Sequence, residues 1–248
     1  MKTGLTSVSF RKLSAEEVIE IAAKAGVDGI EWGSDVHVPA TNTEYAKEIA
    51  EKTREKGLEV ISYGSYFYLG ENADFAPYID TAVAMGTKYI RIWGGKKERH
   101  ELTDEQYAAL VEETKKIGEM AAEKGVIVSL EYHQHSITAT AVDAARFAND
   151  VNMPSIRLYW QSILNRSLED NLADFEFVAP FLTNVHVFNY VDGKQELLEA
   201  GDGIKNWTAY IERIKKVPGE RAIMTEFCKG GLPESFIADA AVLNRLAK

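Results

Sequence analysis

The sequence predicts a single-domain α/β protein, a (β/α)8 TIM barrel that spans residues 1–248. Short runs of apolar, partly β-branched residues alternate with amphipathic helical stretches, and the alternation closes after eight units of roughly thirty residues each. A chain of 248 residues is long enough for one such barrel. An open doubly wound sheet is the structural alternative, but no glycine-rich phosphate-binding motif follows the first strand.

The amino-terminal half is expected to hold four strand–helix units. A β-prone run at 4–10 is the first strand, and Ser14 then caps a helix that Gly26 ends, with acidic residues in its first turn. Pro77 is compatible with the first turn of a later helix. In order, the next elements are strand 29–32, helix 42–56, strand 58–63, helix 75–85, strand 89–93 and helix 103–123.

The carboxy-terminal half repeats this alternation. Its elements are strand 126–130, helix 140–149, strand 156–161, helix 168–178, strand 185–189, helix 207–216, strand 223–226 and helix 233–247. In a barrel of parallel strands, the carboxyl ends of all strands meet at one mouth, where the active site lies. Residues at strand ends are therefore the candidates for chemistry.

Composition excludes some classes of partner. The formal net charge is -10 and the pI is near 5.1, which disfavours nucleic acid because such binding needs Lys and Arg against phosphates. The single Cys228 rules out an intramolecular disulfide and is expected to be a packing residue. We expect no membrane association and a cytoplasmic location, because no window is apolar enough to span a bilayer and no secretory leader is visible at the start.

Four strands end on residues that can bind a metal ion. Glu131 directly follows the fifth expected strand, Gln161 and Glu226 are the last residues of the sixth and eighth, and His186 lies in the seventh. Two carboxylates, an imidazole and an amide oxygen suit Mn²⁺, Mg²⁺ or Zn²⁺ better than a soft metal. The alternative is that the two glutamates accept hydrogen bonds from loops and that His186 is a satisfied core histidine.

Other polar and aromatic residues near strand ends are candidates for binding a substrate. His133 lies two residues past Glu131, shares its face if the strand continues, and can act as an acid or base. The candidates for holding hydroxyl or carboxylate groups, or for stacking on a sugar ring, are His37, Arg91, Lys229, Trp93 and Trp160. Surface ion pairs and plugging of the barrel top are the alternatives for these residues.

The order of these residues resembles the xylose-isomerase-like barrel superfamily, which includes sugar isomerases, ketose 3-epimerases and apurinic endonucleases. The match runs from Gly29-Ile30-Glu31-Trp32 to Thr225-Glu226-Phe227 and includes the Gly-x-Gly segment at 199–207. The resemblance implies a divalent metal that holds a keto sugar and stabilises the enediolate left when a proton leaves carbon. It also implies that Glu131 and Glu226 bind the metal and exchange this proton. Barrels of this family often form dimers through loops near the mouth, so the resemblance leaves open whether this chain forms a homodimer.

The chain departs from the family at two positions. Gln161 stands where the family has a metal-binding Asp, and Leu164 stands where it has a supporting His. The sequence therefore predicts an isomerase or epimerase acting on a small sugar or keto-sugar derivative. A lyase or dehydratase, and a sugar-binding barrel that binds metal weakly or not at all, are the alternatives. Five histidines and the net charge argue against an apurinic endonuclease.

Overall fold

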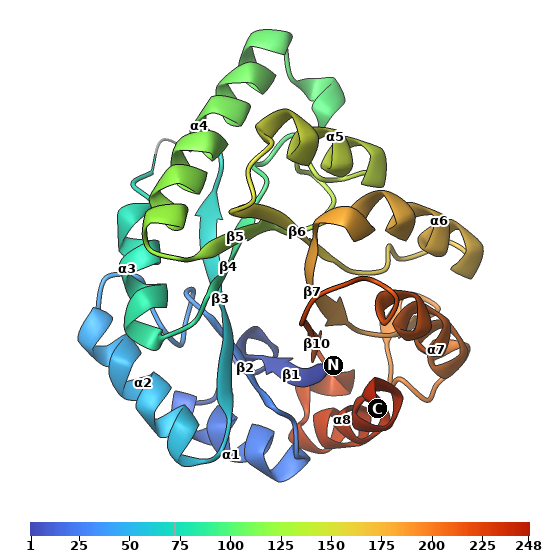
Figure 1. Ribbon diagram of the computed structural model, residues 1–248. Helices are drawn as coiled ribbons and strands as arrows, with labels where there is room; N and C mark the ends of the chain where they lie inside the picture. Colours follow the sequence, from blue (N-terminus) through green and yellow to red (C-terminus); the bar gives the residue numbers. More distant parts are fainter. Residues whose placement is uncertain (72) are drawn as a thin grey trace.

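A closed barrel of parallel strands forms the centre of the computed structural model, which describes residues 1–71 and 73–248 (Figure 1). The barrel strands are β1 (Lys2–Thr6), β2 (Gly29–Gly33), β3 (Glu59–Tyr68), β4 (Tyr89–Trp93), β5 (Ile127–Leu130), β6 (Ile156–Trp160), β7 (Leu182–Val187) and β10 (Ala222–Thr225). Around the barrel their order is β1-β10-β7-β6-β5-β4-β3-β2. The predicted (β/α)8 TIM barrel is confirmed.

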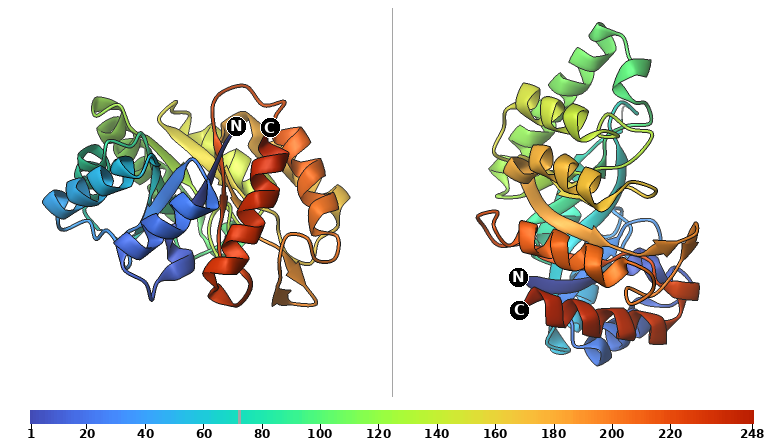
Figure 2. Two further views of the ribbon diagram at one scale, coloured as in Figure 1. Left: turned by 90° about the horizontal axis from the view of Figure 1, so that it is seen from below. Right: turned by 90° about the vertical axis from the view of Figure 1, so that its right-hand side faces the viewer.

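Helices surround this barrel as an outer layer, and the two chain ends lie close together (Figure 2). The helices are α1 (Ala15–Ala25), α2 (Thr43–Glu55), α3 (Ala76–Met85), α4 (Asp104–Glu123), α5 (Ala141–Val151), α6 (Leu168–Val178), α7 (Gly203–Ile214) and α8 (Pro233–Ala247). None of the helices in the described part of the chain is both long and apolar enough to cross a membrane.

Side-chain caps explain why the helix bounds follow the sequence pattern closely. The Ser14 hydroxyl accepts a hydrogen bond from the backbone N of Glu17, whose carboxylate accepts one from the backbone N of Ser14. Thr103 and Gln106 repeat this capping box at the start of α4. Gly26 ends α1 in the left-handed conformation, with φ of 67°.

The predicted strand at 4–10 is wrong in its second half. The first strand ends at Thr6, and Ser7–Phe10 form the 3-10 helix η1. The Ser7 hydroxyl accepts a hydrogen bond from the backbone N of Gly33 at 2.8 Å, so the chain turns where β2 ends beside it. This turn brings Arg11, which the sequence analysis did not select, to the mouth of the barrel.

Other bounds differ around the later strands. The third strand continues to Tyr68 because its aromatic end pairs again with β4 after a register shift, with Tyr68 opposite Trp93. The seventh strand begins at Leu182, and α7 begins at Gly203, four residues before the expected start. A Cβ on Gly203 would lie 2.7 Å from Nδ2 of Asn189, so this glycine belongs to a close-packed helix start. The hairpin of β8 (Tyr190–Val191) and β9 (Lys194–Gln195) was not predicted.

The barrel interior becomes ionic toward the carboxyl ends of the strands. Deeper in the barrel, Ile61, Tyr159, Ala222 and Met224 form a small apolar cluster. Side chains two residues further along a strand point to the same side, one level higher. On β10 this alternation places Glu226 above Met224, so the charged level forms the floor of the mouth.

Candidate active site

Four buried ionisable side chains form one contact network at this level. Arg91, on β4, has Nη1 3.0 Å from Oε2 of Glu131 and Nε 3.8 Å from Oε1 of Glu31. His186, on β7, has Nε2 3.1 Å from the same Glu31 oxygen. None of the four is more than 2% exposed. Buried charges of this kind are stable only when each has an oppositely charged or hydrogen-bonding partner.

Glu226 joins the network on the other side of the His186 ring. Nδ1 of His186 lies 3.4 Å from Oε2 of Glu226 and 3.7 Å from Oε1 of Glu131. One ligand atom from each of these three residues lies within 4.8 Å of the other two. His186 is paired with Met224, two residues before Glu226, so the neighbouring strands β7 and β10 bring the two side chains to the same part of the barrel. Three of the four side chains that the sequence predicted as ligands therefore meet.

Glu31 is a member of the network that the sequence analysis did not assign to the site. Its second oxygen accepts a hydrogen bond from the Ser62 hydroxyl at 2.6 Å. A signal was present, because Glu31 is the only charged residue of β2, a strand whose five residues are all buried. A Cβ on Gly64 would lie 3.0 Å from Glu31 and from Arg91, so glycine on β3 makes room for both side chains.

The partners in the network control its protonation. Burial by itself would raise the pKa of Glu31, but His186, Arg91 and Ser62 lower it to about 2. Burial would lower the pKa of His186, but Glu226, Glu31 and Glu131 raise it well above 6.5. Burial would raise the pKa of Glu131, but Arg91 and His186 lower it. These shifts favour charged Glu31 and Glu131 beside a protonated His186, so a metal ion that binds at Nδ1 would displace a proton from His186.

The donor atoms fit a hard or borderline divalent metal ion. Nδ1 of His186 and Oε1 of Gln161 are buried and have no hydrogen-bond partner among the described residues. Buried polar atoms usually have a partner, which is another protein atom, an ordered water or an ion. Glu131 and Glu226 add carboxylate oxygens, so the set of one nitrogen and several oxygens suits Mn²⁺, Mg²⁺ or Zn²⁺.

A pocket of about 240 Å³ opens at this network, with Glu131 and Glu226 in its lining. Trp93 and His133, both selected from the sequence, line it, whereas Arg91 lies beneath it. The His133 ring packs edge-on against Trp93, and its Nδ1 bonds to the Gln134 carbonyl at 2.8 Å. The full lining is Arg11, Tyr66, Trp93, Glu131, His133, Gln134, Gln161, Ser162, Ile163, Leu164, Phe188, Tyr190, Glu226 and Phe227.

Three other residues selected from the sequence lie outside this pocket. His37 is buried against Trp32, with Nε2 bonded to the Leu13 carbonyl. Trp160 points into the helix layer, where it packs against Trp207. Lys229 is half exposed and forms an ion pair with Glu196 at 2.6 Å. Strand alternation explains the orientation of Trp160. It directly precedes Gln161 in the sequence, and successive side chains of a strand point to opposite sides.

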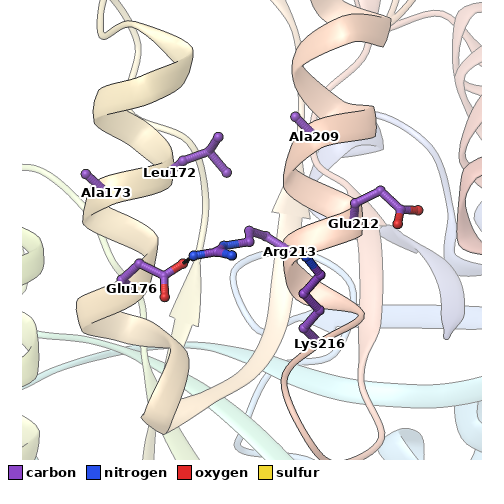
Figure 3. A pocket seen from close by; sticks show the side chains of 7 residues that line it. All are labelled: Leu172, Ala173, Glu176, Ala209, Glu212, Arg213 and Lys216. Carbon is purple, nitrogen blue, oxygen red and sulfur yellow. Dashed lines mark hydrogen bonds and ion pairs between the residues drawn. The ribbon is translucent and has the colours of Figure 1, made fainter.

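A second hollow lies between α6 and α7 on the outside of the barrel (Figure 3). Its volume is about 360 Å³, and Arg213 of α7 crosses it to form an ion pair with Glu176 of α6. The residues shown are Leu172, Ala173, Glu176, Ala209, Glu212, Arg213 and Lys216. Among the residues that the structure describes, the group of side chains able to hold a metal ion is Glu131, His186 and Glu226, not the lining of this hollow, so we place the candidate active site at the mouth.

Comparison with known proteins identifies one protein family and several relatives of the same fold. Residues 19–246 match the protein family described as xylose isomerase-like TIM barrel. A 3-dehydroshikimate dehydratase of Bacillus anthracis is 23% identical over 201 residues, which cover 76% of this chain and 72% of the relative. An inosose dehydratase of Glaesserella parasuis is 25% identical over 254 residues, which cover 89% and 80%.

Solved structures share the fold at lower identity. The probable 3-dehydroshikimate dehydratase of Bacillus anthracis has a TM-score of 0.82 at 20% identity and covers 98% of this chain and 99% of its own. An L-ribulose 3-epimerase has a TM-score of 0.77 at 15% identity, covering 99% and 94%. A xylose isomerase-like barrel from Mycobacterium smegmatis in complex with magnesium has a TM-score of 0.74 at 14% identity, covering 100% and 98%.

Proposed function

Because the chain belongs to the xylose isomerase-like TIM barrel family, we propose that it is a divalent-metal-dependent enzyme acting on a sugar or sugar-like ketone. The reaction begins with removal of a proton from the carbon beside the carbonyl. The observation that carries this proposal is the convergence of Glu131, Glu226 and Nδ1 of His186 below the pocket. The relatives in this family include dehydratases and an epimerase, and both reactions can begin in this way.

Glu131, His186 and Glu226 would hold the metal, and the buried Gln161 oxygen is the candidate fourth ligand. A bound Mn²⁺, Mg²⁺ or Zn²⁺ supplies Lewis-acid polarisation of the substrate carbonyl, which lowers the pKa of the neighbouring C–H group. A carboxylate is otherwise a weak base toward carbon.

The two glutamates have different surroundings, and this assigns them different roles. Oε2 of Glu131 is within 3.0 Å of Arg91, which restrains that oxygen and reduces its basicity. Glu226 also lines the pocket, and its side-chain ion-pair contact is with His186. Glu226 is therefore the stronger candidate for the base. An epimerase that uses two bases needs an effective base on each face of the substrate. The contact with Arg91 makes Glu131 a poor second base.

His133 is the candidate acid. Its Nδ1–H donates to the Gln134 carbonyl, so Nε2 is the nitrogen that can exchange a proton with a substrate. One base and one acid are sufficient for dehydration. Glu226 takes the proton beside the carbonyl, the C–H electron pair forms the new C=C bond, and the C–O bond on the next carbon breaks as Nε2 of His133 gives its proton to the departing hydroxyl group, which leaves as water. We therefore favour dehydration over epimerisation.

The test combines metal content with two product assays. Protein purified without chelator is analysed for metal, loaded with Mn²⁺, and incubated in D₂O with inosose, 3-dehydroshikimate and a panel of keto sugars. A dehydratase gives a product lighter by one water, which is an enone when the substrate is a saturated ketone and an aromatic dihydroxybenzoate when it is 3-dehydroshikimate. An epimerase returns a deuterated isomer of unchanged oxygen content.

Two variants complete the test. Glu226→Gln should abolish both metal retention and turnover, whereas Glu59→Gln, an exposed change at the start of β3, should preserve both. If wild-type protein binds neither added Mn²⁺ nor any of these ketones, the proposal is refuted. Ketone binding without metal and without turnover would instead indicate a sugar-binding barrel.

A further inference from the structure

We propose that Glu31 is a positioning residue that fixes the His186 ring so that Nδ1, and not Nε2, binds the metal. The inference rests on the proposed metal-dependent function. It assigns a role to a residue that does not reach the pocket itself, because Glu31 lies on the opposite side of the imidazole from Glu131 and Glu226.

The geometry at Glu31 leaves it one way to contact the ring. Oε2 accepts the Ser62 hydroxyl at 2.6 Å, and Oε1 lies 3.1 Å from Nε2 of His186. An ionised carboxylate can only accept hydrogen bonds. In the contact between Oε1 of Glu31 and Nε2 of His186, Nε2 must therefore carry the hydrogen. Nδ1 then has the free lone pair in the neutral ring, directed toward Glu131 and Glu226.

Without Glu31 the ring would have a different preference. Two carboxylates lie 3.4 and 3.7 Å from Nδ1, and both would attract a hydrogen to that nitrogen. A hydrogen on Nδ1 blocks metal binding there. Glu31 opposes this by offering a hydrogen-bond acceptor to Nε2, which orients the ring and makes Nδ1 a more basic ligand.

The position of Glu31 is itself fixed by its neighbours. Ser62 holds one oxygen, Arg91 lies 3.8 Å from the other, and Gly64 leaves the space that both long side chains occupy. Loss of such an outer hydrogen-bond partner lowers metal affinity about 10–100-fold in other metal sites. We expect a loss in this range for Glu31→Leu, and a smaller loss for Ser62→Ala, which releases only one oxygen of Glu31.

The experiment measures Mn²⁺ affinity by electron paramagnetic resonance for wild type, Glu31→Leu, Glu31→Gln and the control Glu59→Gln. Glu31→Gln keeps the shape of the side chain and an acceptor oxygen, so it should fold and lose less affinity than Glu31→Leu. Cooperative thermal unfolding of each variant is recorded alongside. A general packing defect would lower the midpoint without this graded order of affinities.

Proton NMR of the Zn²⁺-loaded protein provides a second readout. We expect a low-field imidazole N–H resonance from Nε2 bonded to Glu31, assigned by its loss in His186→Gln and shifted upfield in Glu31→Gln. Equal Mn²⁺ affinity of Glu31→Leu and wild type, or a low-field resonance unchanged by Glu31→Gln, would overturn the role of Glu31 while leaving the metal site intact. Failure of wild-type protein to bind metal would overturn both proposals.

Discussion

Nη1 of Arg91 lies 3.0 Å from Oε2 of Glu131, in a contact that is almost completely closed to solvent. The same glutamate lies 3.7 Å from Nδ1 of His186, the nitrogen that we propose binds the metal. Arg91 and a divalent metal ion would therefore share one carboxylate. Arg91 would then stabilise the metal-free barrel and also compete with the metal for Glu131.

Replacement of Arg91 by Met separates these two effects. Removal of one partner from a buried ion pair costs about 3–5 kcal/mol, so the metal-free variant should unfold at a clearly lower temperature. Added Mn²⁺ should raise its unfolding temperature more than that of wild type, because the metal replaces the lost positive charge. Thermal unfolding with EDTA and with Mn²⁺ measures both.

The control for this change is Arg213→Met, which breaks the exposed ion pair with Glu176 between α6 and α7. Exposed pairs contribute about 0–1 kcal/mol, so it should change stability little and respond to Mn²⁺ as wild type does. Equal Mn²⁺ shifts in Arg91→Met and wild type would show that Arg91 and the metal do not share Glu131.

Gln161 offers a direct test of ligand charge. Gln161→Asp adds one carboxylate beside a buried, unpartnered oxygen position, and hard divalent ions bind more tightly as the number of anionic ligands rises. We expect Mn²⁺ affinity to rise about tenfold or more, measured by isothermal titration calorimetry. Gln161→Asn shortens the side chain equally without adding charge, and it should not raise the affinity. A gain in both variants would point to relief of crowding and not to ligand charge.

The sequence predicted the fold well because its signals are local. Serine and threonine caps, helix-ending glycines and apolar strand runs set most element bounds without reference to distant residues. The predicted bounds were wrong where contacts between residues far apart in the sequence determine the structure. Ser7 accepts a hydrogen bond from Gly33 where the chain turns, and α7 begins at Gly203, where the Leu198 carbonyl and Asn189 leave no room for a Cβ.

The site could be predicted only in part, for the same physical reason. Strand ends identify Glu131, His186 and Glu226 because all parallel strands end at one mouth. Glu31 and Arg91 lie inside β2 and β4 and not at the strand ends, and their partners come from other strands, so their contacts follow from barrel closure and register. Trp160 and His37 have suitable chemistry, but alternation and loop packing direct them away from the pocket.

Gly64 tests how closely the buried network is packed. A methyl group at this position would lie 3.0 Å from both Nη2 of Arg91 and Oε1 of Glu31, so Gly64→Ala must displace at least one of them. We expect a loss of about 1–3 kcal/mol in stability, as for other overpacked cores, together with weaker Mn²⁺ binding. Denaturant unfolding and Mn²⁺ titration measure the two effects. Gly57→Ala, at an open position with positive φ, is the control that should lower stability without weakening Mn²⁺ binding.

Asp239 predicts a pH dependence of stability that is separate from the active site. This α8 side chain is 3% exposed and accepts a hydrogen bond from the backbone N of Leu198 at 2.8 Å. Burial, with a contribution from the charge of Glu199, raises the pKa of Asp239 from 3.8 to about 6. Between these two values the folded chain binds more protons than the unfolded chain, so this group lowers stability as pH rises from about 4 to 6.

Asp239→Asn cannot ionise and should lack this penalty. The difference in unfolding free energy between variant and wild type should therefore increase in favour of the variant by about 2 kcal/mol from pH 4 to pH 7, whatever its value at pH 4. Denaturant unfolding across this pH range measures the change. Because other titrating groups are common to both proteins, they cancel in the difference, and a difference independent of pH would show that Asp239 has an ordinary pKa in the folded chain.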